Sequence, residues 1–165
     1  MIRRRKQPEG DGGPLDVYTG LRTQALDAAG TQSPAPSHPD VLGVVIDIPL
    51  DDSHLTVMTL ADGTTSMYTS TGGGTIGAGA HASVVSASTV LLDQLQSDLV
   101  LFPGDKRTNL PEPGMVQITV LTPKGRQRAN LPEPAFWGEE PSTLQPLISA
   151  MQDLITAIRT AETPA

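Results

Sequence analysis

The chain has 165 residues, a formal net charge of −7 and an isoelectric point of about 4.7. The absence of cysteine from the sequence excludes disulfides and thiol chemistry, and it favours a cytoplasmic location. No apolar run approaches the roughly 20 residues that a membrane-spanning helix needs. A hydrophobic content of 38% supports one domain with a largely aliphatic core.

Both ends of the chain are expected to be disordered, on either side of a single domain at residues 15–160. Residues 1–13 form a basic tail with too few apolar side chains to pack, and residues 161–165 form a second tail. Arg3 to Lys6 resembles the charged start of an export signal. An export signal needs an apolar region after its charged start, but a polar segment follows here, so we expect a cytoplasmic protein.

Charge is unevenly distributed along the domain. Between Arg22 and Lys106 the sequence contains nine Asp and no Lys or Arg. Such an acidic region either keeps the protein soluble or steers a partner towards it. Its sign disfavours nucleic acid as a partner of the folded domain.

The domain is predicted to begin with a helix and a linker. Apolar residues recur at helical spacing from Leu15 to Ala29, and Gly30 then marks the end of the helix. Three prolines within residues 31–39 predict an extended, mobile linker.

Three strands are expected next. Residues 41–48 are rich in β-branched side chains and apolar on both faces until Asp47. Strands at 55–60 and 64–70 follow, and the Asp-Gly turn between them predicts an antiparallel hairpin.

A glycine-rich segment, residues 72–79, separates these strands from the second half of the domain. We expect an irregular hinge here, because glycine loses more backbone entropy than other residues in regular structure. A long helix then begins at Ser83 and two strands follow at 115–121 and 126–130. An amphipathic helix over 142–159 closes the domain.

The glycine segment is the first candidate site. Backbone N–H groups of a glycine loop before a helix can bind phosphate, and the candidate residues are Gly72, Gly73, Gly74 and Thr75. The Lys and Ser/Thr of a phosphate-binding P-loop are missing after these glycines. We therefore favour the alternative, a hinge or a point of close backbone packing.

The sequence shows no clear catalytic or metal-binding pattern. Its three histidines lack the paired spacing of a zinc site. Ser70 or Ser83 could combine with His81 and Asp62 in a nucleophilic triad, but the Gly-x-Ser-x-Gly pattern that positions such a serine is absent. We expect no metal, no cofactor and no catalytic residue, and we favour a non-enzymatic protein.

Two features of the C-terminal part are candidates for contact with a partner. Phe136 and Trp137 either fill the gap between the last strand and the last helix or form an interaction hot spot. The closing helix has an apolar stripe wide enough to face both the sheet and a neighbouring molecule. Its candidate residues are Leu147, Met151, Leu154 and Ile158.

These predictions describe an α+β fold with a five-stranded antiparallel sheet, the element order α-βββ-α-ββ-α, and helices packed mainly on one face. Over residues 15–160 the chain resembles class I chaperones of type III secretion. The resemblance lies in this order of elements, the chain length, the low isoelectric point and the closing amphipathic helix. The resemblance implies a fold that dimerises and binds other polypeptides.

The predicted function is therefore a non-catalytic protein-interaction module, either chaperone-like, adaptor or immunity-like, with no membrane contact. Its partner is another polypeptide or a second copy. We expect a homodimer because one layer of helices leaves a sheet face uncovered, and the first helix is short for that task. The alternative is a small-ligand or phosphate-compound binding protein, with or without enzymatic activity, that uses Gly72–Gly79.

Overall fold

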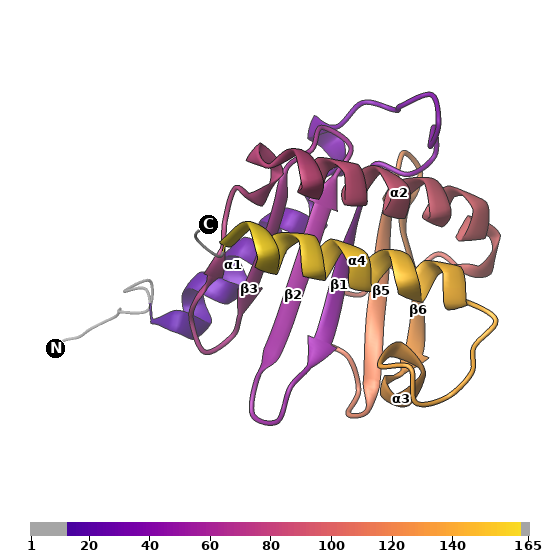
Figure 1. Cartoon of the computed structure of the whole chain (residues 1–165). Helices are drawn as coiled ribbons and strands as arrows, with labels where there is room; N and C mark the ends of the chain where they lie inside the picture. The colour runs from indigo at the N-terminus through magenta and orange to yellow at the C-terminus, as the bar shows by residue number, and fades with distance from the viewer. Residues whose placement is uncertain (1–12, 163–165) are drawn as a thin grey trace, which may run out of the picture.

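The computed structural model describes residues 13–162 and shows an α+β protein with helices on both faces of one antiparallel sheet (Figure 1). α2 (Ala82–Asp98) and α4 (Gln145–Glu162) lie in front of the sheet in this view, and α1 (Pro14–Leu26) lies behind it. Residues 1–12 and 163–165 of the two predicted tails lie outside the described residues. Residues 161 and 162 belong to α4 rather than to a tail.

Six strands form the sheet in the order β4-β3-β2-β1-β5-β6, and all neighbours are antiparallel. The strands are β1 (Gly43–Pro49), β2 (His54–Leu60), β3 (Thr65–Thr69), β4 (Gly74–Thr75), β5 (Met115–Thr122) and β6 (Gly125–Pro132). The other described elements are α3 (Glu133–Phe136) and 3-10 helices at Ala28–Thr31, Ala78–Ala80 and Leu99–Leu101.

The hairpin that the Asp-Gly turn predicts is present, and β5 and β6 form a second one. At the first, Gly63 has a φ of +94°, and the Asp62 carboxylate accepts a hydrogen bond from the Thr64 N–H at 2.9 Å. At the second, Thr122 pairs with Gly125. β6 lies at an edge of the sheet, and residues 103–105 cover part of that edge. The Asp105 N–H donates to the Arg126 carbonyl and the Arg128 N–H donates to the Pro103 carbonyl, each at 2.9 Å.

The prediction of five strands is wrong, because the glycine segment contributes a sixth. In β4, Gly74 pairs with Tyr68 and Thr75 pairs with Met67. Gly74 has a φ of +143°, and a Cβ atom there would lie 2.2 Å from the Met67 carbonyl oxygen. Glycine thus permits two backbones to approach closely, and this pairing outweighs its entropy loss. The observed order also gains α3, a single turn too short to produce an apolar period.

The face covered by α2 and α4 holds the main hydrophobic core. The central strand β1 contributes Val44, Ile46 and Ile48, all fully buried. The apolar stripe of α2 faces the same core, except that Val85 is exposed. Burial of one large aliphatic side chain contributes about 1.5–3 kcal/mol, so this face provides most of the apolar stabilisation.

α1 and residues 107–109 cover the opposite face. Ala25 of α1 packs with Val45 of β1 and Met58 of β2. The homodimer was expected because one layer of helices would leave this face of the sheet without a cover. α1 and residues 107–109 cover it, so that argument for a homodimer no longer applies. The homodimer itself stays a prediction.

The Pro-rich segment 31–39 is extended only in part: residues 36, 37 and 39 form turns, and Ala35 pairs with His38 in an isolated bridge. His38 is buried, and its Nδ1 atom lies 2.9 Å from the Val41 carbonyl oxygen. The Ser37 hydroxyl donates a hydrogen bond to the Asp93 carboxylate of α2 at 2.7 Å. A short-range contact at His38 and a hydrogen bond from Ser37 to the distant helix α2 therefore tie this segment to the domain, an effect that proline content alone does not predict.

Candidate functional site

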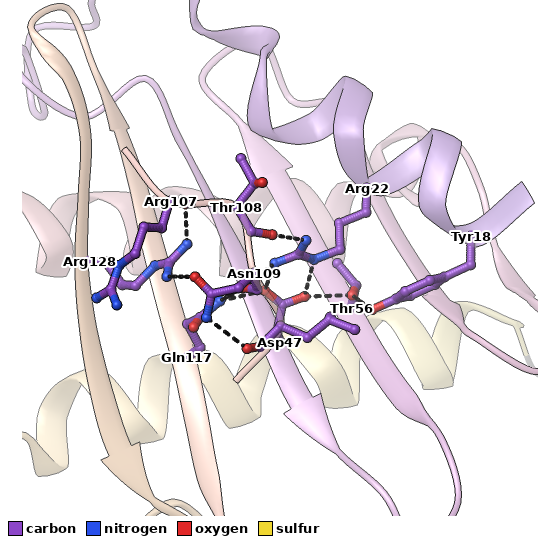
Figure 2. A network of polar contacts seen from close by, with 10 residues as sticks. Tyr18, Arg22, Asp47, Thr56, Arg107, Thr108, Asn109, Gln117 and Arg128 are labelled. Atoms are coloured by element: carbon purple, nitrogen blue, oxygen red, sulfur yellow. Dashed lines mark hydrogen bonds and ion pairs between the residues drawn. The ribbon is translucent and has the colours of Figure 1, made fainter. Parts of the chain in front are cut away.

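A buried carboxylate lies at the centre of the face that α1 covers (Figure 2). Asp47 of β1 has no exposed surface, and its two carboxylate oxygens accept hydrogen bonds from Nε and Nη2 of Arg22, each at 2.9 Å. Thr56 donates to the same carboxylate at 2.7 Å, and Gln117 does so at 3.4 Å. Four donors therefore surround one carboxylate, which satisfies a buried charge.

The same network holds the segment 107–109 against the sheet. Arg22 donates to the backbone carbonyls of Thr108 and Asn109, at 2.6 Å and 3.2 Å. Gln117 donates to the Asn109 carbonyl at 2.8 Å. Arg128 of β6 donates to the Asn109 side-chain oxygen at 3.0 Å and to the Arg107 carbonyl. One arginine of α1 thus connects the helix, the central strand and a distant loop.

Two tyrosines extend this network towards the glycine segment. The Thr56 hydroxyl uses its proton on Asp47, so the Tyr18 hydroxyl must donate to Thr56, at 2.6 Å. Tyr18 and Tyr68 pack edge to face with ring centroids 5.7 Å apart. Tyr68 is buried, and its hydroxyl has no hydrogen-bond partner among the described residues.

The electrostatics of this network favour a structural role. Burial raises the pKa of both Tyr18 and Tyr68, so the two phenols are neutral at physiological pH. Burial alone would lower the pKa of Arg22, but the hydrogen bond and the charge of Asp47 outweigh it, and the pKa rises. Arg22, Thr56 and Gln117 all donate hydrogen bonds to the Asp47 carboxylate, and Arg22 stays ionised. The network therefore holds no pair of groups arranged for proton transfer to a substrate.

A groove lies beside the two tyrosines, between α1 and the glycine segment, with a volume of about 360 Å³. We call it the α1–glycine groove. None of its ten lining residues is charged. They are Pro14, Val17, Tyr18, Leu21, Tyr68, Thr69, Gly72, Gly73, Gly74 and Ile76.

Three of the four ligand-binding candidates from the sequence therefore line one groove. Gly72, Gly73 and Gly74 all have positive φ values, of +105°, +90° and +143°. The carbonyls of Gly72 and Gly73 accept hydrogen bonds from the hydroxyl and the N–H of Thr69, which fixes the loop. The fourth candidate, Thr75, does not line the groove, and its hydroxyl is buried without a described partner.

The interaction candidates separate into buried and exposed residues. Phe136 is buried, and the Trp137 ring packs edge to face against it with 48% of the residue exposed. Phe136 therefore fills the gap below α4, and Trp137 reaches the surface. The other four candidates lie in the core between α4 and the sheet: Leu147, Met151, Leu154 and Ile158. Their burial leaves them no surface for a neighbouring molecule.

The remaining polar candidates lie apart. The hydrogen bonds of the described residues do not join His81 to Ser70, Ser83 or Asp62; the Ser70 hydroxyl instead accepts from the His54 N–H at 2.9 Å. Residues 13–162 contain no group of three His, Asp or Glu that could hold a metal ion. None of the described helices is long and apolar enough to cross a membrane.

Sequence reasoning missed most of the groove and all of the buried network. The groove brings α1 together with strand β3 and the glycine segment, roughly 50 residues later, and no local spacing reveals that contact. One signal was present: Asp47 interrupts an otherwise apolar strand, and a buried Asp requires a charged or hydrogen-bonding partner.

The fold and groove thus define an α+β protein with an uncharged groove at one end of its sheet. Comparisons with protein-family models, curated proteins and solved structures gave no match for the chain. The resemblance to secretion chaperones remains a prediction from the order of elements, and the function must be argued from the site.

Proposed function

We propose that this protein is a non-catalytic binding module that receives an apolar side chain of a partner polypeptide in the α1–glycine groove. The observation that carries the proposal is the lining, in which ten residues include no charged side chain. A volume of about 360 Å³ lies at the lower end of the range for ligand sites and accommodates one large side chain.

The surroundings of the groove favour a polypeptide over a small molecule. Val17 and Ile76 line the groove and remain 51% and 63% exposed. A ligand confined to the groove would leave their outer surfaces in water. β4 is the terminal strand on this side of the sheet, and an edge strand can pair with an added chain. A partner strand with one side chain in the groove would cover both features.

A phosphate compound fits this site less well. Phosphate sites combine backbone N–H groups with Lys or Arg, and no lining residue is cationic. Among the described residues, the α1 helix that lines the groove carries one cation, Arg22, and it is already paired with Asp47. An enzymatic role lacks support for a related reason, since the described residues bring no nucleophile and base together at the groove.

The test uses NMR spectra of the ¹⁵N-labelled full chain with three probes. N-acetyl-leucine amide should shift the amides of Val17, Tyr68 and Gly73, and inorganic phosphate should leave them unchanged. An acetylated seven-residue peptide with Leu at its centre and alternating Thr and Val should bind at least about tenfold more tightly than the leucine amide, because it adds strand pairing.

Matched variants locate the binding. Val17→Asp should weaken peptide binding at least about tenfold, because it places a charge in the apolar lining. Val90→Asp should not, since Val90 is similarly exposed, at 55%, on α2 and outside the groove. Shifts caused by phosphate alone, equal affinity for the leucine amide and the peptide, or equal effects of the two variants would each contradict the proposal.

A further inference from the structure

A second groove lies at the opposite end of the molecule from the α1–glycine groove, where α3 meets the first turns of α4 (Figure 1). Its volume is about 270 Å³, and we call it the Trp137 groove. The residues that matter for its chemistry are Phe136, Trp137, Gln145, Ser149, Gln152 and Asp153. It combines one exposed aromatic ring, a carboxylate and several neutral hydrogen-bonding groups.

The Trp137 ring is held in place by its neighbours. Phe136, which is 1% exposed, packs edge to face against it with centroids 4.9 Å apart. The backbone N–H of Trp137 donates to the Glu133 carbonyl at 3.0 Å, which fixes the backbone at this residue, and Gln152 of α4 donates to the Phe136 carbonyl at 2.9 Å. A fixed ring that stays 48% exposed provides contact area at a small entropy cost, as in binding hot spots.

The sequence on either side of this ring carries charge of one sign. Between Arg128 and Arg159 the sequence contains four carboxylates and no Lys or Arg. These carboxylates are Glu133, Glu139, Glu140 and Asp153. The ion pairs among the described residues involve none of them. A partner that supplies a positive charge would therefore complement this surface.

We propose that the Trp137 groove binds the side chain of an arginine or lysine from a basic partner polypeptide. The cation lies against the indole face, where the ring quadrupole attracts it, and its N–H groups donate to the Asp153 carboxylate. Ser149 and Gln145 offer further acceptor oxygens beside it.

These acceptors select among cations. A quaternary ammonium also binds an aromatic face, but it has no N–H to donate to a carboxylate or a hydroxyl. A guanidinium provides five N–H donors, stacks on aromatic rings and is weakly hydrated. The groove therefore prefers arginine over lysine, and either of them over tetramethylammonium.

The sequence contains only one tryptophan, so intrinsic fluorescence of the full chain reports directly on this groove. The probe is an acetylated, amidated tetra-arginine peptide in buffers with 20 mM and 500 mM NaCl. We expect a saturable change in Trp137 emission, tighter for tetra-arginine than for tetra-lysine, with little response to tetramethylammonium. Raising the salt should weaken binding several-fold, because exposed charges are screened.

A matched pair of variants separates a site from general attraction to an acidic protein. Asp153→Asn should weaken tetra-arginine binding about threefold to tenfold, whereas Glu162→Gln removes the same charge from the same helix outside the groove and should change it little. Trp137→Leu, followed by calorimetry, should also weaken it. An unchanged emission, equal effects of the two carboxylate variants, or equal affinity for all three cations would overturn the proposal. The readout does not depend on the α1–glycine groove.

Discussion

The two faces of the sheet are stabilised in different ways. On the face below α2 and α4, β1 presents Val44, Ile46 and Ile48 to a continuous apolar core. On the other face, the same strand presents Asp47 to hydrogen bonds from α1, β2 and β5. Apolar burial is non-directional and tolerates small shifts, whereas a buried ion pair fixes the position of its partners. We infer that the polar network sets where α1 and residues 107–109 lie.

The largest expected effect comes from breaking that network at its centre. Asp47→Ala removes the carboxylate that pairs with Arg22 and leaves a buried positive charge without a counter-ion. Such changes destabilise proteins by about 3–5 kcal/mol, which urea denaturation followed by circular dichroism would measure.

A double replacement sharpens this prediction. Arg22→Met with Asp47→Leu removes both charges and keeps similar volumes, so much of the lost stability should return. Exposure of residues 107–109 should nevertheless increase in hydrogen exchange, because Arg22 no longer donates to the Thr108 and Asn109 carbonyls. A double variant as unstable as the single variant would show that packing, not charge, explains the loss.

The difference between the faces also explains how far the sequence could be interpreted. The apolar face has a period that the sequence shows: Val116, Ile118 and Val120 alternate along β5, and all three lie in the core. The polar face has none, because Arg22 meets Asp47 across 25 residues and Thr108 across 86. Periodicity reports the local exposure of a strand or helix, but a hydrogen bond between distant segments leaves no trace in it.

The candidate site was predictable only in part, for the same reason. Residues 72–79 were a candidate site because the segment is unusually rich in glycine, and the structure places three of these glycines on a wall of the groove. The remaining walls come from α1 and β3, which only the folded structure brings next to the glycine segment. The stripe of α4 was correctly predicted as apolar, but a stripe does not tell whether its residues face a sheet or a partner. The structure buries Leu147 and Met151 in the core.

At the edge of the sheet, stability depends on neither apolar burial nor an ion pair but on the close approach of the β4 backbone to β3. Gly74→Ala should destabilise the fold by about 1–3 kcal/mol or more, because its Cβ would meet the Met67 carbonyl at 2.2 Å and its φ is +143°. Gly73→Ala is the matched control: its φ is +90°, but nothing lies within 4 Å of the added atom.

The difference between the two variants in thermal unfolding isolates the close approach from the backbone preference of glycine. We expect Gly74→Ala to lower the melting temperature more than Gly73→Ala. Equal losses would mean that β4 moves away from β3 without penalty, and the pairing of Gly74 with Tyr68 would then contribute little to the fold.

The smallest effect should come from the two tyrosines, which differ in one hydrogen bond. Tyr18→Phe removes a donor to Thr56 and should cost about 0.5–1.5 kcal/mol. Tyr68→Phe removes a buried hydroxyl without a described partner, so stability should stay the same or rise by up to about 1 kcal/mol.

The pH dependence of stability gives an independent check on the same pair. Burial raises the pKa of both phenols in the folded state, so the unfolded chain loses these protons first as the pH rises. Their contribution is fully present below the unfolded tyrosine pKa of roughly 10 and is lost progressively as the pH rises above it. Each Phe variant should therefore lose less stability than the unmodified protein between pH 9 and pH 11, measured by urea denaturation. The change should be larger for Tyr68→Phe, because no hydrogen bond from a neighbour offsets the burial of that hydroxyl. A steeper fall in the Tyr68→Phe protein would show that this phenol is not held neutral by burial.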